Sequence, residues 1–243
     1  MREVIELTAD ELVARHIEAR GGLDRIMAIR TLCQKGIVKM PGADVRISGE
    51  RKRPNLLRIE FAVGHMSGKE GWDGERAWEF NPWKGMTKAE YVNGNPSIAL
   101  QRGAEFDGPL VGFREKGHVI EYTGREQLGE REAYRLEVTL QDGNTIHYCL
   151  DTESLLTVQT RSVRPVHGGE AAETETIYGD YREVAGVFFP FWSKETARGG
   201  EHVEVFQWES IEANVPISDK RFQLPTMSRK WPHLATQEDS TEL

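Results

Sequence analysis

The stretch 173–197, ETETIYGDYREVAGVFFPFWSKETA, decides the fold class. Polar and apolar residues alternate over 174–178, and Val184-Ala185-Gly186 then supplies a turn in which glycine accepts a positive φ. The run 187–192 is aromatic and β-branched, which suits a pleated surface covered on at least one face. Pro190 cannot donate to a sheet ladder and indicates an edge, a bulge or a bend. The stretch therefore predicts a hairpin that curves over an apolar interior.

The same alternation extends through most of the chain. About ten or eleven strands are expected, and they span 31–40, 44–51, 55–63, 76–80, 118–127, 131–140, 144–151, 154–164, 172–183, 187–197 and 201–214. Their short connections predict an antiparallel sheet, and a sheet of that size tends to curl or close. The predicted fold class is mainly β with a few helices (α+β): a curved antiparallel half-barrel covered by helices, formed by one domain over 1–225 with a C-terminal tail over 226–243.

Helices are expected in two places. Thr8 and Glu11 form a capping-box pattern, and Gly21-Gly22 ends the helix that they begin. A second short helix follows over 23–29. Asn95-Pro96 then begins a weak helix inside the long insertion 84–110, which is rich in Gly, Asn and Pro. Residues 84–106 are a candidate lid, and a plain crossover packed against the sheet is an equal alternative.

Composition excludes several classes of protein. The chain has 243 residues, 38% hydrophobic and 29% charged, which is typical of a globular domain. A net charge of −8 without a basic block excludes a nucleic-acid partner. No apolar run approaches the roughly 20 residues of a membrane span. The start MREVIELTADEL lacks a signal pattern, so we expect a cytoplasmic protein if this N-terminus is native and a periplasmic or otherwise extracytoplasmic one if a signal peptide was removed.

An unusually aromatic set of strand residues suggests an apolar binding cavity inside the half-barrel. Simple filling of the core by these side chains is the competing interpretation. Arg76 could hold a ligand head group at the cavity mouth or be an exposed arginine at a strand end. The candidate ligand-binding residues are Leu57, Ile59, Phe61, Trp72, Arg76, Trp78, Phe80, Leu100, Phe106, Tyr134, Phe189 and Phe191.

Motifs of enzyme chemistry are absent from the sequence: it holds no G-x-S-x-G, no H-E-x-x-H, no phosphate loop and no dinucleotide fingerprint. His147 and Cys149 share one face of a strand, but we expect them to be structural. His16 lies on an apolar helix face, where a packed histidine is commoner than a catalytic one. Cys33 and Cys149 both fall in predicted strands and favour two buried thiols over a disulfide. We expect no catalytic residue, no cofactor and no metal.

The order of several segments resembles the outer-membrane lipoprotein-sorting, LolA-like superfamily, which also contains LppX-like mycobacterial lipid carriers. The matching segments are 9–26, 52–60, 71–82, 106–118, 178–191 and 214–222. None of them is a chemical motif, so the resemblance lies in their order and spacing. It implies a helix-covered half-barrel that holds acyl chains or another hydrophobic ligand, and an extracytoplasmic location.

Three hypotheses for function follow. The first is a carrier that holds a lipid, a lipoprotein acyl chain or a similar hydrophobic small molecule, with a membrane transporter or a lipoprotein as its protein partner. The second is an enzyme of the cyclase or isomerase type acting on a hydrophobic intermediate in the same cavity; a titratable group with a perturbed pKa there would favour it. The third is a scaffold or accessory subunit that uses an outer sheet face.

Overall fold

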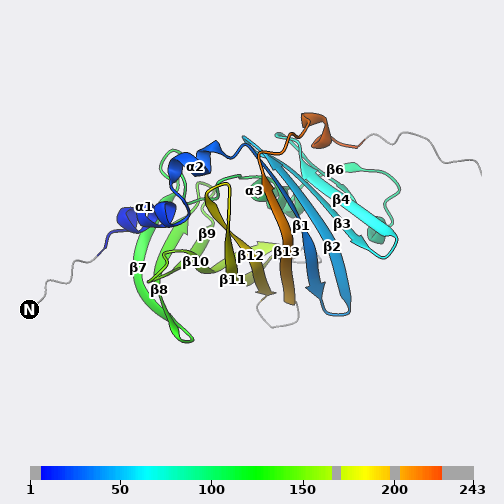
Figure 1. Cartoon of the computed structure of the whole chain (residues 1–243). Helices are drawn as coiled ribbons and strands as arrows, with labels where there is room; N and C mark the ends of the chain where they lie inside the picture. The colour runs from blue at the N-terminus through cyan, green and yellow to red at the C-terminus, as the bar shows by residue number, and fades with distance from the viewer. Residues whose placement is uncertain (1–6, 166–170, 198–202, 226–243) are drawn as a thin grey trace, which may run out of the picture.

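A computed structural model describes residues 7–165, 171–197 and 203–225. In this part of the chain, thirteen antiparallel strands form one sheet that does not close into a barrel (Figure 1). The helices are α1 (Ala9–Ala19), α2 (Leu23–Ala28) and α3 (Asn95–Gly103), with 3-10 turns η1 (Pro82–Lys84) and η2 (Asp219–Arg221). The strands are β1 (Thr31–Met40), β2 (Ala43–Lys52), β3 (Leu56–Val63), β4 (Met66–Trp72), β5 (Ala77–Phe80), β6 (Glu90–Val92), β7 (Val119–Leu128), β8 (Arg131–Thr139), β9 (Thr145–Asp151), β10 (Thr157–Pro165), β11 (Ala171–Val184), β12 (Val187–Ala197) and β13 (Val203–Ala213).

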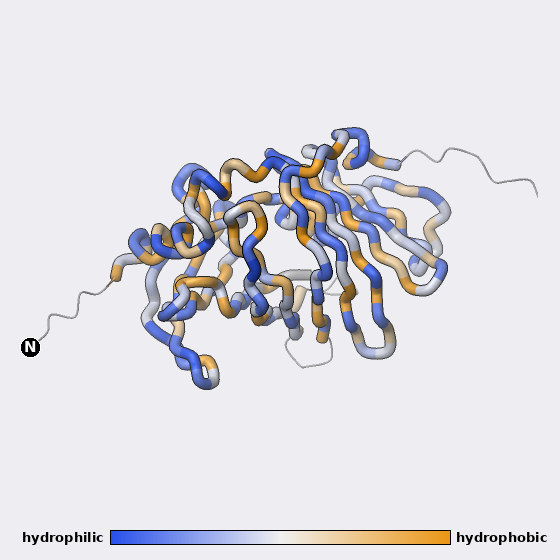
Figure 2. Tube along the Cα trace, viewed as in Figure 1, coloured by the Kyte–Doolittle hydropathy of each residue, from blue (hydrophilic) through white to orange (hydrophobic). Residues whose placement is uncertain are grey.

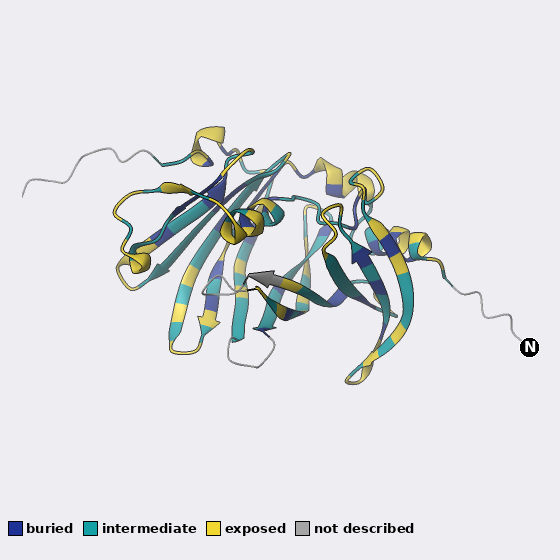
Figure 3. Ribbon diagram, turned by 180° about the vertical axis from the view of Figure 1, so that it is seen from behind, coloured by how far each residue is buried: buried dark blue, intermediate teal, exposed yellow. Residues whose placement is uncertain are grey.

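The strand order is β6-β5-β4-β3-β2-β1-β13-β12-β11-β10-β9-β8-β7. Every neighbouring pair is consecutive in sequence except β1 and β13, which join the first and last strands at the middle of the sheet. Both edges are therefore formed from the centre of the chain. Figures 1 and 3 show the sheet bending round between these edges, with α1 and α2 along its upper rim in Figure 1.

The expected fold class is confirmed, although the sheet has more strands than the ten or eleven expected. The sequence missed β4, because Met66–Trp72 is polar and contains two glycines. Those glycines are needed, since a Cβ at Gly68 would lie 2.3 Å from the Phe61 ring and one at Gly71 would lie 2.7 Å from Trp78. β6 was missed because it is only three residues long. The tail 226–243 lies outside the described residues.

The hairpin of 173–197 forms as expected, with irregularities that explain its unusual residues. Asp180 and Ala185 take positive φ values of 50° and 51° within β11 and the turn after it. Pro190 lies outside the stretch of β12, Trp192–Thr196, that pairs with β13, so its missing N–H costs no hydrogen bond to that strand.

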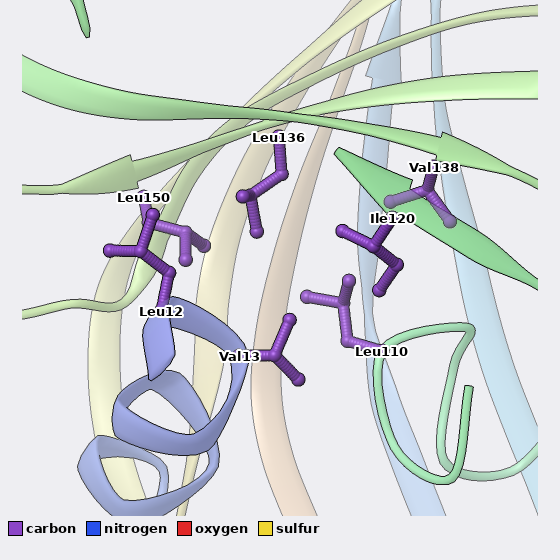
Figure 4. Packing of buried hydrophobic residues seen from close by; sticks show 7 residues of the cluster. All are labelled: Leu12, Val13, Leu110, Ile120, Leu136, Val138 and Leu150. Carbon is purple, nitrogen blue, oxygen red and sulfur yellow. The ribbon is translucent and has the colours of Figure 1, made fainter. Parts of the chain in front are cut away.

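We call the face of the sheet that carries Leu57, Trp72 and Leu136 the inner face, and the opposite one the outer face. Alternating hydrophobic and hydrophilic residues run along many strands (Figure 2), as expected for a sheet with two different faces. The helices cover the inner face in three sectors. Under α1, Leu12 and Val13 point toward apolar side chains of β7, β8 and β9 and toward Leu110 of the loop between α3 and β7 (Figure 4).

The other two sectors are packed in the same way. The sector under α2 joins that helix to β1, β12 and β13, and its buried members are Ile26, Ile29, Leu32, Val111, Val187, Phe191 and Ile211. The sector under α3 joins Leu100 and Ala104 to β3, β4 and β5. α3 also contacts β10, so it spans from one half of the sheet to the other. Within the described residues, no helix is both long enough and apolar enough to cross a membrane.

The outer face is covered at one place by the C-terminal segment. Trp78 is fully buried there, and its Nε1–H donates to the Phe222 carbonyl oxygen at 2.7 Å. Around this contact, Arg58 and Arg221 both form ion pairs with Glu50. The chain end at 217–222 therefore folds back over the outside of β1–β5 and leaves the inner face to the helices.

Candidate functional site

A cavity of about 150 Å³ lies between the sectors under α1 and α2. Its wall is formed by the end of α1, by the loop after α3, by the inner side of β9, β10 and β11, and by Phe188 and Pro190 of β12. Unlike the three packed sectors, it gathers polar groups. The lining residues are His16, Arg20, Asp107, Gly108, Pro109, Leu110, Tyr148, Thr157, Thr160, Tyr178, Tyr181, Phe188 and Pro190.

Arg20 is fixed at the end of α1 by its backbone. It is the C-cap residue of the helix, and its carbonyl oxygen accepts a 2.8 Å bond from the Phe188 N–H. The next residue, Gly21, has a φ of 126°, and a Cβ there would lie 2.1 Å from the Gly186 carbonyl oxygen. Only glycine permits this close approach of α1 to the β11–β12 turn. These backbone contacts fix the Cα of Arg20 at the edge of the cavity.

The Arg20 guanidinium has no ion-pair or hydrogen-bond partner in the described part of the chain. Burial lowers its pKa, while the nearby Tyr181, Tyr148 and Asp107 act in the opposite direction. An arginine nonetheless keeps its charge in proteins. The cavity thus contains a partly desolvated positive charge without a counter-ion.

Three tyrosines from two strands converge on the same space. The Tyr181 hydroxyl donates to the Thr157 carbonyl oxygen at 2.7 Å, and the Tyr178 hydroxyl lies 3.1 Å from Thr160 Oγ1. The Tyr148 hydroxyl has no partner within the described residues. Burial raises the pKa of Tyr148 and of Tyr181, so both stay protonated and can donate hydrogen bonds.

A backbone irregularity brings two of these tyrosines together. Residues three apart on a regular strand point to opposite faces. Tyr178 and Tyr181 nevertheless both line the cavity, and the positive φ of Asp180 lies between them. The strained residue therefore turns both side chains toward the same space, which is a use of strain typical of functional sites.

His16 is buried at 3% exposure, and its Nδ1–H donates to the Leu155 carbonyl oxygen at 2.8 Å. Burial lowers its pKa to about 4, because the charged ring would be desolvated; the bond to Leu155 opposes this shift. At neutral pH the imidazole is therefore uncharged, with Nε2 as an acceptor. The residue is packed, as the commoner alternative had it, and it also contributes to the cavity wall.

Asp107, the remaining charged group of the wall, is already paired. Arg53 contacts its two carboxylate oxygens at 2.5 and 2.6 Å and also donates to the carbonyl oxygens of Ile26 and Ile29. The Arg53 guanidinium lies 4.5 Å above the Phe106 ring. This Arg53 clamp ties the loop after α3 to α2, so Asp107 is not free to neutralise Arg20.

A larger depression of about 610 Å³ lies outside this cavity, between the end of α2 and the chain leaving β13. Its lining includes Lys52, which donates to the Ile217 carbonyl oxygen at 2.8 Å, and consists otherwise largely of the segment 214–218. Because it holds no comparable group of converging side chains, we take the cavity around Arg20 as the candidate site.

None of the twelve residues predicted from the sequence lines the cavity. Several pack in the inner sectors: Leu57, Ile59, Trp72 and Leu100 under α3, Phe106, Phe189 and Phe191 under α2, and Tyr134 beside the α1 sector. Phe61 lies on the inner face of β3 and stacks on Trp83 at 5.7 Å between ring centroids.

The other predicted residues lie elsewhere. Trp78 and Phe80 share the outer face of β5, where Trp78 meets Phe222. Arg76 is exposed, and its guanidinium lies 3.7 Å above the Tyr91 ring and donates to the Tyr91 hydroxyl. This is the exposed strand-end arginine of the second alternative.

His147 and the two cysteines singled out in the sequence also lie outside the cavity. His147 and Cys149 share the outer face of β9, where His147 Nδ1 lies 3.7 Å from Glu137. Cys33 and Cys149 are both free thiols in strands. Arg20, Tyr148, Tyr178 and Tyr181 were not singled out. The sequence signal that could have identified this site is the recurrence of polar residues at inward-facing positions of β9, β10 and β11.

Comparison with known proteins identifies the fold. No family model matches the sequence, and no curated protein matches it. A LolA superfamily protein from Nitrosomonas europaea superposes with a TM-score of 0.59 at 13% identity, over 90% of this chain and 98% of that one. A DUF1329 family protein from Desulfovibrio piger gives 0.58 at 10% identity, over 88% and 97%.

A third solved structure is a putative outer membrane lipoprotein-sorting protein domain from Vibrio parahaemolyticus, with a TM-score of 0.58 at 8% identity, over 88% of this chain and 97% of that one. At such identities the likeness concerns the fold alone. The resemblance expected from the order of segments is therefore confirmed at the level of the fold, which this chain shares with LolA superfamily proteins.

Proposed function

We propose that this protein is a carrier that holds a hydrophobic ligand, a lipid or a lipoprotein acyl chain, against the inner face of its open sheet. The observation that carries the proposal is the inner face itself: one continuous curved sheet whose apolar residues are covered by three short helices and not by a second sheet. Burial of apolar ligand area at roughly 25 cal/mol per Å² would supply the affinity.

The ligand needs more room than the cavity offers. A space of about 150 Å³ is smaller than the roughly 300–1,000 Å³ of most small-molecule sites. We therefore propose that the chain of the ligand takes the place of α3 on the inner face. Movement of residues 84–106 would uncover Leu57, Ile59 and Trp72. The exposed ion pair between Arg102 and Asp142 is a weak tether for such a lid.

The fold comparison supports this class of function by analogy only, because one fold serves many functions. One neighbour is described as a putative outer membrane lipoprotein-sorting protein domain. An extracytoplasmic location and a membrane transporter or lipoprotein as partner belong to the same proposal.

One observation favours an enzyme as the second candidate: His16, with its shifted pKa, lines the cavity beside Tyr148. A general base works best with a pKa near the working pH, and a base with a pKa of about 4 is weak at neutral pH. Binding is therefore the better supported function.

The first test is native mass spectrometry of the protein purified from cells, followed by lipid extraction. We expect a co-purifying acyl lipid that leaves only on denaturation. A ligand-free mass, together with no uptake of a fluorescent fatty-acid probe, would overturn the carrier proposal. A bound small molecule that is chemically converted on incubation would favour the enzyme.

A pair of variants then tests the face of the sheet. Ile59→Asp places a charge on the inner face, and Phe80→Asp places the same charge on the outer face two strands away. We expect probe binding to fall at least tenfold in the first variant and to persist in the second, with both folds checked by circular dichroism. Equal losses would place the ligand elsewhere.

A further inference from the structure

The cavity around Arg20 combines a guanidinium with tyrosine hydroxyls, which is a composition suited to binding an anion. We propose that Arg20 and the Tyr148 hydroxyl bind the carboxylate of an acyl ligand, so that the cargo is an anionic amphiphile such as a free fatty acid. This inference rests on the proposed carrier function and adds the chemical class of the ligand.

The unpaired charge is the first argument. Removing an ion from water is costly unless a counter-ion or hydrogen bonds replace the lost hydration. Three other arginines near the inner helices have partners: Arg53 has Asp107, Arg102 has Asp142 and Arg114 has Asp10. Arg20 has none in the described part of the chain, although it points into a cavity. A bound anion would supply the missing partner.

The hydroxyl groups are the second argument. The Tyr148 O–H has no acceptor within the described residues and stays protonated. A planar guanidinium and a phenol that share one small space can together bind the two oxygens of a carboxylate. The hydroxyls of Tyr178 and Thr160 bond each other and complete a polar wall beside it.

Charge and size select the anion. One unpaired guanidinium matches the single negative charge of a carboxylate, whereas a phosphate monoester carries about −1.5 to −2. A cavity of about 150 Å³ has the size of one that takes up benzene. It therefore fits a carboxylate with a few carbons, and the rest of an acyl chain must lie beyond it, along the inner face.

The test is isothermal titration of the full chain with decanoate, with decanol as the uncharged analogue and with butyrate as the short carboxylate. We expect tighter binding of decanoate than of decanol. Arg20→Gln should weaken decanoate binding about 10- to 100-fold, the loss expected for a charge-assisted hydrogen bond, and leave decanol unchanged. Tyr148→Phe should weaken decanoate binding about threefold to tenfold.

Arg15→Gln is the matched control, because Arg15 lies on the same helix and is exposed. It should leave every affinity unchanged. Thermal unfolding checks the fold, and Arg20→Gln should unfold no earlier than the wild type, since it removes a charge without a partner. A clear loss of stability would make Arg20 structural and overturn the inference.

The ligands separate this inference from the carrier proposal. Equal affinity for decanoate and decanol, unaffected by Arg20→Gln, would overturn the carboxylate site and leave the carrier standing. Butyrate binding that depends on Arg20, without binding of either long-chain ligand, would support the carboxylate site and overturn the carrier. Binding of none of the three would overturn both.

Discussion

Two arginines near the end of α1 and α2 differ in almost every contact. Arg53 has its guanidinium saturated by Asp107 and two helix carbonyl oxygens, and its side chain is 13% exposed. Arg20 is held by its backbone, and its guanidinium lines a cavity without a partner in residues 7–165, 171–197 and 203–225. A charge whose partners are all internal stabilises the fold. A charge left without a partner at a defined position is available for a ligand. The free energy that its desolvation costs is offset by favourable contacts elsewhere in the structure.

The largest effect is expected at the Arg53 clamp. Arg53→Met should lower the free energy of unfolding by about 3–5 kcal/mol, because Asp107 would remain buried and unpaired. Denaturation in urea measures the change. Arg114→Gln is the control, since its ion pair with Asp10 is exposed and should be worth less than about 1 kcal/mol. Similar losses in both variants would remove the distinction between a clamp and a surface pair.

The next effect concerns His16, beside Arg20. Its pKa is about 4 in the fold against 6.5 for the free side chain. The unfolded chain therefore takes up a proton first, and stability falls by about 3 kcal/mol as the pH drops from about 6.5 to about 4. His16→Asn keeps a donor for the Leu155 carbonyl oxygen and should flatten this slope. Urea denaturation at a series of pH values measures it, and an unchanged slope would assign the acid sensitivity to other groups.

The third effect is expected at Glu70, a titratable group on the inner face. Burial raises its pKa to about 7, and the facing Glu79 adds to the shift, while Lys84 opposes it. The folded state thus keeps a proton that the unfolded chain loses above about 4.5, so this contribution to stability is lost as the pH rises through about 7.

Glu70→Gln should therefore stabilise the protein by about 3 kcal/mol at pH 8 and leave it unchanged at pH 4. Melting curves at the two pH values provide the measurement. A gain of equal size at both would indicate a packing effect and not a titration.

Much of the fold could be predicted from the sequence because period-two alternation and turn residues are local signals. The capping box at Thr8, the glycine stop at Gly21-Gly22 and the helix beginning at Asn95 all occur where expected. β4 was not predicted because Gly68 and Gly71 are poor strand formers. Glycine is needed at these two positions only because the rings of Phe61 and Trp78, on the neighbouring strands, lie too close for a Cβ.

The site was harder to predict for a physical reason. Alternation shows that Trp78 and Phe80 share a face, but not which face the helices cover. The C-terminal segment around Phe222 covers the outer one, and no local pattern announces that contact. Arg20 is one arginine among many in the sequence, and it stands out only because its guanidinium has no partner among the described residues. Tyr178 and Tyr181 would be assigned to opposite faces without the turn at Asp180.

The pairing of β1 with β13 has a consequence for how the chain reaches its structure. All other strand pairs are formed by neighbours in sequence, so β1–β6 and β7–β13 can each assemble from local turns. Only the pairing of Leu32 with Ala213 and its neighbours must wait for the whole chain. Closing that contact carries the largest loop entropy in the sheet. During synthesis on the ribosome, the strand pairs between sequence neighbours could thus form first, and the pairing of β1 with β13 at the middle of the sheet would form last.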